Sequence, residues 1–232
     1  MGARTVMVIQ ARMGSTRLPG KVLMPFAGAP MLQRLIERVV RSRLADGPVV
    51  ATTVNDADDP IADLCARLGV ACHRGSDADV LARVQGAAEA AGAEVVVRLT
   101  ADNPFVDGVL VDRAVAVFRE ASPPVDYAHT VDGSGFAYGL FVEVVSMRAL
   151  GLAARVADEE EREHVTLFLR RHPELFRAAV VRAPGRFAYN RLTVDTPDEY
   201  VAMRALFERL YAADPAFGID ALLLAVGAEA RA

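Results

Sequence analysis

One short segment near the N-terminus concentrates the residue types that bind phosphate groups. From Gln10 to Lys21 the chain reads Gln-Ala-Arg-Met-Gly-Ser-Thr-Arg-Leu-Pro-Gly-Lys, with two glycines, two arginines and one lysine. Glycines let the backbone approach a phosphate, and the cations neutralise its charge. The segment is not a Walker P-loop, because five residues separate Gly14 from Gly20 where that motif has four, and Val22 replaces its Ser or Thr. The structural alternative is a solvated basic loop.

Two aspartates follow segments that are typical of strands. Asp102 lies in Leu-Thr-Ala-Asp-Asn-Pro after the apolar run Val95–Val97, and Asp195 lies in Leu-Thr-Val-Asp-Thr-Pro. Carboxylates at strand ends suit a Mg²⁺ ion that bridges substrate phosphates. Each also has a structural interpretation, because Asp-Asn-Pro is a common turn and an acid or Thr196 before Pro197 is a typical helix cap. Together with the phosphate loop, the two acids favour a nucleotide site.

The elements that must position these residues alternate between strand and helix in the first half of the chain. Strands are predicted over 5–10, 49–54, 70–73 and 94–100, and helices over 30–44, 59–69, 77–91 and 109–121. This order favours an α/β sheet that is mostly parallel and binds its ligand at the carboxyl ends of the strands.

The second half of the chain is less regular. Strands are predicted over 125–130, 139–147, 176–182 and 191–194, and helices over 159–171, 197–213 and 219–230. No internal repeat or linker is evident. We therefore expect a single domain over 1–232, with a β-rich insertion or lobe at 125–190.

The composition excludes several classes of protein. The chain has 232 residues, 53% of them hydrophobic, and a net charge of −4, which argues against disorder and against a general nucleic-acid binder. No apolar run approaches the ~20 residues of a membrane span, and the N-terminus lacks the pattern of a secretory signal. We expect a cytoplasmic protein without membrane or nucleic-acid partners. Its two cysteines, Cys65 and Cys72, are expected to be reduced packing residues.

The order of the motifs resembles a known enzyme family. Gln10–Leu23 is similar to the opening of the cytidylyltransferases that activate acidic sugars, with the spore-coat-polysaccharide SpsF type nearest and the 3-deoxy-manno-octulosonate and acylneuraminate enzymes more distant. The similarity continues to about residue 210 through the segments 50–53, 74–77, 80–83, 98–104, 161–166 and 191–199. It implies a GT-A-like nucleotidyltransferase fold, with a mostly parallel central sheet flanked by helices and a smaller β-rich lobe, and a homodimer.

The resemblance also implies roles for matched positions. The expected nucleotide contacts are Ala11, Arg12, Gly14, Lys21, Arg74 and Ser76, the last two at the base and ribose. Arg12 and Lys21 would neutralise the triphosphate of CTP, and Asp102 and Asp195 would bind Mg²⁺. Arg12, Lys21 and Asp102 are therefore the expected catalytic residues.

The acceptor side carries a departure from the family pattern. The expected acceptor-binding residues are Tyr138, Glu143, Glu163, His164 and Arg191, although His164 has an equally good interpretation as a capped helix residue. SpsF-type sequences commonly read Asp-Gly-Leu-Asp-Val-Glu-Val where this chain has Tyr-Gly-Leu-Phe-Val-Glu-Val, so Tyr138 and Phe141 replace two acids. If this segment lines the acceptor pocket, we expect an acceptor that is less polar, or differently charged, than the usual acidic sugar.

The expected reaction is the Mg²⁺-dependent transfer of CMP from CTP to a sugar-like or sugar-phosphate acceptor, with release of pyrophosphate. Two alternatives remain: a glycosyltransferase of the same fold that consumes a nucleotide sugar, and a non-catalytic nucleotide-binding module. The pair Arg12 and Lys21 favours a triphosphate, because a diphosphate sugar needs less positive charge. The residues alone do not identify the acceptor, the base or the oligomeric state.

Overall fold

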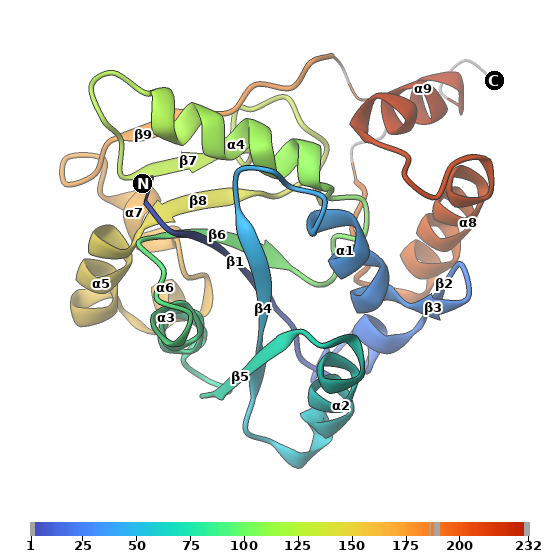
Figure 1. Cartoon of the computed structure of the whole chain (residues 1–232), viewed down its shortest axis with the longest axis horizontal. Coiled ribbons are helices and arrows are strands. Elements are labelled where there is room, and N and C mark those ends of the chain that lie inside the picture. Colours follow the sequence, from blue (N-terminus) through green and yellow to red (C-terminus); the bar gives the residue numbers. More distant parts are fainter. Residues whose placement is uncertain (1–2, 186, 188–190, 230–232) are drawn as a thin grey trace.

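A seven-stranded sheet forms the centre of the molecule in the computed structural model, which describes residues 3–185, 187 and 191–229 (Figure 1). The strands are β1 (Thr5–Gln10), β4 (Asp46–Thr53), β5 (Ala71–Gly75), β6 (Val95–Thr100), β7 (Tyr127–His129), β8 (Glu143–Ser146) and β9 (Ala178–Val180). Their order is β5-β4-β1-β6-β8-β7-β9. Strand β8 is antiparallel to both neighbours, and the other adjacent pairs are parallel. The prediction of a mostly parallel sheet is confirmed.

Helices cover both faces of this sheet (Figure 1). One face packs against α1 (Met31–Val39), α2 (Asp59–Leu68), α4 (Gly108–Glu120), α8 (Pro197–Ala213) and α9 (Ile219–Glu229). The other carries α3 (Val80–Ala90), α5 (Met147–Val156), α6 (Glu159–Glu163) and α7 (Leu167–Arg171). A small hairpin, β2 (Pro25–Phe26) and β3 (Ala29–Pro30), precedes α1. Because alternate residues of β1 enter two different cores, the strand is apolar on both sides.

The region predicted as β-rich extends the same sheet, since β7, β8 and β9 all lie within 125–190. The single helix predicted over 159–171 is wrong: α6 and α7 are separate, because Val165 between them has φ +54°, which an α-helix cannot contain. Ala230, the predicted end of the last helix, lies outside the described residues. In the described part of the chain, no helix is long and apolar enough to span a bilayer.

The prediction of a strand over 191–194 is also wrong. The conformation that this segment adopts instead helps to build the site. The N–H of Leu192 donates to the carbonyl of Tyr138 (2.6 Å), and the N–H of Val194 donates to the carbonyl of Asp102 (3.0 Å). Successive donors thus bond to different segments, so no ladder forms. This extended segment instead ties the turn after β6 to the approach to β8.

Gly139 permits this close contact because it has no side chain, and the cost of adding one can be predicted. Its φ is +101°, and a Cβ there would lie 2.5 Å from the carbonyl carbon of Leu192. We expect Gly139→Ala to lower the unfolding free energy by roughly 2–5 kcal/mol, from backbone strain plus overpacking. Gly151→Ala in α5 is the matched control, because open space surrounds that position and alanine favours helix. Urea unfolding followed by circular dichroism measures both; equal midpoints would contradict the prediction.

Candidate functional site

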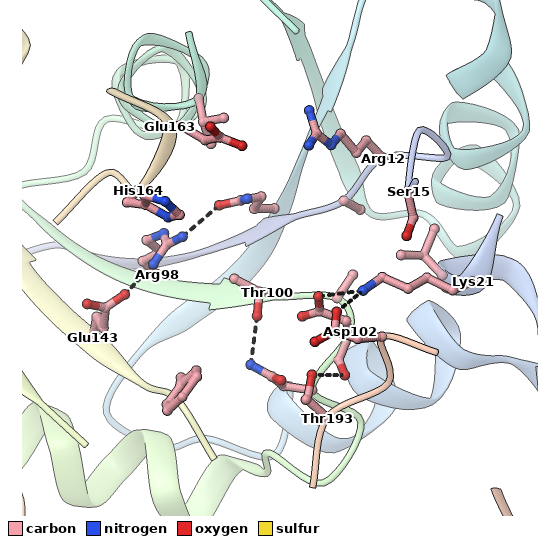
Figure 2. A pocket seen from close by; sticks show the side chains of 18 of the residues that line it. Arg12, Ser15, Lys21, Arg98, Thr100, Asp102, Glu143, Glu163, His164 and Thr193 are labelled. Carbon is pink, nitrogen blue, oxygen red and sulfur yellow. Dashed lines mark hydrogen bonds and ion pairs between the residues drawn. The ribbon is translucent and has the colours of Figure 1, made fainter. Parts of the chain in front are cut away.

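A cavity of about 530 Å³ opens at the edge of the sheet where β1 and β6 end (Figure 2). Parallel strands bring their carboxyl ends to one edge, which is where ligands bind in such folds. The main walls are the loop after β1, the turn after β6, the segments 131–143 and 193–195, and the turn between α6 and α7. Figure 2 shows Lys21 and Asp102 at one end of the cavity and His164 at the other.

The ammonium group of Lys21 joins the two predicted acids. Its Nζ donates hydrogen bonds of 2.8 Å each to Asp102 Oδ2, Asp195 Oδ1 and the carbonyl of Val194. Lys21 opens a 3₁₀ turn immediately after Gly20, and its side chain is 10% exposed. The loop after β1 is therefore tied directly to both acids.

The turn that carries Asp102 is fixed from two sides. The Asn103 side-chain amide donates to the Thr100 hydroxyl at 2.7 Å. The Thr193 hydroxyl donates to the carbonyl of Asp102 at 3.2 Å (Figure 2). These bonds hold the turn in place while its carboxylate faces the cavity.

Asp195 is surrounded by cations. Besides Lys21, its carboxylate lies 3.1 Å from Arg17 and 2.7 Å from Arg191. Burial acts to raise the pKa of Asp195, but the hydrogen bond and charge of Lys21, with the charges of the two arginines, outweigh it and lower that pKa. Its backbone N–H donates to Glu199, which also takes part in the capping box at the start of α8. The predicted helix-cap role thus falls to Thr196, while the Asp195 side chain stays in the site.

The loop after β1 supplies further walls at the end of the cavity that holds Lys21. Three residues that the sequence predicts to contact the nucleotide line the cavity, namely Ala11, Arg12 and Gly14. Their contact with a nucleotide stays a prediction. The Arg12 guanidinium lies 3.2 Å from Asp77, and both side chains are substantially exposed. Nothing in the fold crowds Gly14, so its lack of a side chain leaves room on the cavity side.

Two predicted nucleotide contacts lie outside the residues that line the cavity. Arg74 bonds to Asp59 at 2.6 Å and to the carbonyls of Thr53 and Asn55, each at 2.9 Å. The exposed Ser76 hydroxyl accepts a hydrogen bond from the N–H of Asp79, next to the start of α3. Both sit beside the loop that holds Asp77, and their contact with base and ribose stays a prediction.

Glu143, predicted to bind the acceptor, is the centre of a buried polar network. Its carboxylate accepts hydrogen bonds from Tyr127, Thr166 and Arg98, while Arg98 also donates to Gln10 at 2.9 Å. Burial acts to raise the pKa of Glu143, yet the Arg98 charge and the three hydrogen bonds outweigh it and lower that pKa. Glu143 lines the cavity but has both oxygens occupied, so it orients Arg98 and the α6–α7 turn.

Of the other predicted acceptor residues, all but Arg191 line the cavity. Glu163 and His164 are exposed and line it, as do Tyr138 and Phe141, whose rings meet edge to face at 4.6 Å. Arg191 does not line the cavity; its guanidinium lies 4.4 Å above the Tyr138 ring. The two residues that replace the family's acids therefore do face the cavity.

The chemistry of Asp102 and Asp195 fits a divalent cation shared with a substrate. Both carboxylates contact one cationic nitrogen, the Nζ of Lys21, so both reach a common point where positive charge is stabilised. Within the described ranges, no cluster of three or more His, Cys, Asp or Glu side chains could hold a metal ion. Mg²⁺ commonly takes one or two carboxylates and completes its shell with phosphate oxygens and water. The pair suits an ion that arrives with phosphates.

Several cavity residues were given no individual role from the sequence. Gln10, Arg17, Arg98, Thr100 and Thr193 all line the cavity. Arg98 carried a usable signal, because it is the one charge within the apolar run from Val95 to Thr100. A buried charge in a central strand needs partners, and it therefore marks a site.

Comparisons with known proteins agree with this geometry. A family model described as cytidylyltransferase matches residues 6–212. The chain is 39% identical over 211 residues to the spore coat polysaccharide biosynthesis protein SpsF of Bacillus subtilis, covering 87% of this chain and 85% of that protein. It is 38% identical over 118 residues to a 3-deoxy-manno-octulosonate cytidylyltransferase of Geobacter sulfurreducens, covering 49% of this chain and 44% of that protein.

A solved structure extends the likeness to the whole fold. A cytidylyltransferase from Leptospira borgpetersenii superposes with a TM-score of 0.87 at 28% identity, covering 96% of this chain and 94% of that one. The fold is that of the nucleotidyltransferases, and the chain belongs to the cytidylyltransferase family.

The buried network predicts that Glu143 contributes strongly to stability. Glu143→Gln would leave the buried Arg98 charge without its counter-ion, at a cost of about 3–5 kcal/mol in unfolding free energy at pH 7. Glu163→Gln, which alters an exposed acid of the same cavity, should stay within about 0.5 kcal/mol of wild type. Urea unfolding compares the two; equal losses would contradict a structural role for Glu143.

The lowered pKa of Glu143 predicts that the unfolding free energy depends on pH. Because the folded-state pKa of Glu143 lies below its ordinary value of about 4.3, its stabilisation is complete above that pH. It is lost as the pH falls through the lower folded pKa. Between pH 7 and pH 3, Glu143→Gln should therefore lose less stability than wild type, measured by urea midpoints across that range. A mutant whose midpoints fall in parallel with wild type would contradict the prediction.

Proposed function

We propose that this protein transfers CMP from CTP to a hydroxyl of a sugar-like or sugar-phosphate acceptor, with release of pyrophosphate. One observation carries the proposal: in a chain of the cytidylyltransferase family, Lys21, Asp102 and Asp195 meet at one end of a cavity. The phosphate-rich substrate would lie along the loop after β1. The acceptor would occupy the end formed by Tyr138 and His164.

The residues of the chain would act mainly by positioning and by stabilising charge. Arg12, Arg17 and Lys21 would hold the triphosphate and stabilise the negative charge that develops on departing pyrophosphate. Asp102 and Asp195 would hold Mg²⁺, which supplies positive charge to the phosphates when bound. The acceptor oxygen would attack the α-phosphorus in line, opposite the leaving group.

The residues at the proposed acceptor end favour a sugar that carries little negative charge. The Geobacter sulfurreducens relative is named for 3-deoxy-manno-octulosonate, a sugar acid. Here Tyr138 and Phe141 present aromatic surface to the cavity, and Arg98 is already paired with Glu143. We therefore propose an acceptor that is less acidic than that of the relative.

Nucleotide binding tests the substrate class. A triphosphate at about 100 times its Kd adds ~2.7 kcal/mol, which is roughly 5–11 °C in Tm for a chain of this size. We expect such a shift for CTP with Mg²⁺ and smaller shifts for UTP, ATP and GTP. A shift with a nucleotide sugar but with no triphosphate would favour the glycosyltransferase alternative. CTP binding without pyrophosphate release across a panel of sugar acceptors would favour the binding module.

Asp102→Asn tests the reaction itself. Removing one preorganised charge partner should lower the rate of pyrophosphate release by roughly 10²–10³-fold. Asp198→Asn changes an exposed acid on the first turn of α8 and should leave the rate unchanged. A coupled pyrophosphate assay compares the variants at saturating CTP; near-normal turnover by Asp102→Asn would remove that carboxylate from the mechanism.

The replacement of two acids by Tyr138 and Phe141 leads to a prediction about which acceptor the enzyme prefers. Turnover of 3-deoxy-manno-octulosonate by wild type is measured first, and Tyr138→Asp combined with Phe141→Asp, which restores the residue types of SpsF-type relatives, should lower turnover of the acceptor that wild type prefers. Tyr138→Phe keeps the ring and should keep the wild-type preference. If wild type already uses that sugar acid efficiently, the less acidic acceptor is excluded.

A further inference from the structure

Lys21 is the only lysine of the chain, whose other 25 basic side chains are all arginines. The residue type is informative at this position. A lysine ammonium is a compact charge with three donors on a flexible stem, whereas a guanidinium is a rigid planar fork. The space among Asp102, Asp195 and the Val194 carbonyl is filled by a single nitrogen.

All three donors of Lys21 are already used. An ammonium group has three N–H bonds, and Nζ has three acceptors, each at 2.8 Å. No donor remains for a phosphate oxygen. Lys21 can contact a triphosphate only after it gives up at least one of these partners.

The partners that Lys21 holds are the same oxygens that a divalent cation would need. Asp102 Oδ2 and Asp195 Oδ1 both face Nζ, and two cations cannot share that position without strong repulsion. We propose that Lys21 is the resident cation of the two-carboxylate site and that it exchanges to the triphosphate when a divalent ion binds there. This inference rests on the proposed function, because it assumes that Asp102 and Asp195 hold the metal.

The surroundings permit the exchange. Arg191 contacts Asp195 Oδ2, so that carboxylate keeps one cationic partner when Lys21 leaves, whereas Arg17 contacts the same Oδ1 as Lys21 and would move to the triphosphate with it. Asp102 is the more exposed of the two acids, which gives an incoming ion access from the cavity. The consequence is a linked binding order: the metal binds poorly alone and well together with the nucleotide that receives Lys21.

Metal binding without nucleotide is the first test. Mn²⁺ is the probe, and its free concentration is measured by electron paramagnetic resonance. We expect Lys21→Met to bind Mn²⁺ more tightly than wild type by roughly tenfold or more, because the charged hydrogen bonds that compete with it are gone. Arg12→Met, which removes a cavity cation that touches neither acid, should match wild type. Adding Asp195→Asn to Lys21→Met should abolish the gain.

The outcomes separate the two proposals. Equal Mn²⁺ affinity in wild type and folded Lys21→Met would overturn the exchange. Tight Mn²⁺ binding that survives Asp195→Asn would place the metal elsewhere and would overturn it too. Loss of the exchange alongside normal binding of CTP with Mg²⁺, measured by calorimetry, would leave the proposed function intact.

A second test uses the wild-type chain and so does not depend on a variant folding. Protein labelled with ¹³C-lysine gives one Cε resonance, because Lys21 is the only lysine. We expect that resonance to shift when Mg²⁺ and CTP are added together, and to move little with Mg²⁺ alone at the same concentration. An unchanged resonance at saturating Mg²⁺ and CTP, with binding verified by calorimetry, would overturn the exchange. Absence of CTP binding would instead contradict the proposed function.

Discussion

The site depends on the hydrogen bonds of the Lys21 ammonium group to two carboxylates, because these bonds join parts of the chain that are far apart in sequence. The two carboxylate partners of Lys21 lie 81 and 174 positions further along. Parallel strands β1 and β6 bring the first two segments to one edge of the sheet, and the extended segment around Val194 returns to meet them. Two acids so close would repel one another, so a cation between them is a condition for this arrangement.

Strand β8, the one antiparallel strand of the seven described in the central sheet, has a specific consequence for the opposite end of the cavity. In a parallel strand the first residue lies far from the carboxyl edge where ligands bind. Because β8 runs the other way, Glu143 at its start lies directly opposite Arg98, near the end of β6. Tyr127 on β7 and Thr166 after α6 then reach the same carboxylate. The change of strand direction thus builds a second polar centre beside the first.

Sequence patterns predicted the parts of the fold that depend on local physics. Apolar runs such as Thr5–Gln10 and the acid after β6 were found because burial and turn chemistry leave a local signature. The break at Val165 and the irregular segment from Arg191 were missed, and each lies beside a contact with a distant residue: Thr166 donates to Glu143, and Arg191 pairs with Tyr138. The orienting role of Glu143 was missed for the same reason: its three donors come from three other elements.

The two ends of the cavity use their charges differently. In the loop after β1, Arg12 and Arg17 make ion pairs while their side chains remain 40% and 59% exposed, so water can replace their partners at little cost. At the other end, the Arg98 and Glu143 side chains are 13% and 5% exposed, and separating them would strand a buried charge. The proposed reaction, which brings in a triphosphate and releases pyrophosphate, would require cations that change partners. The Arg98–Glu143 pair would instead stay in place and keep that wall of the cavity fixed while an acceptor binds.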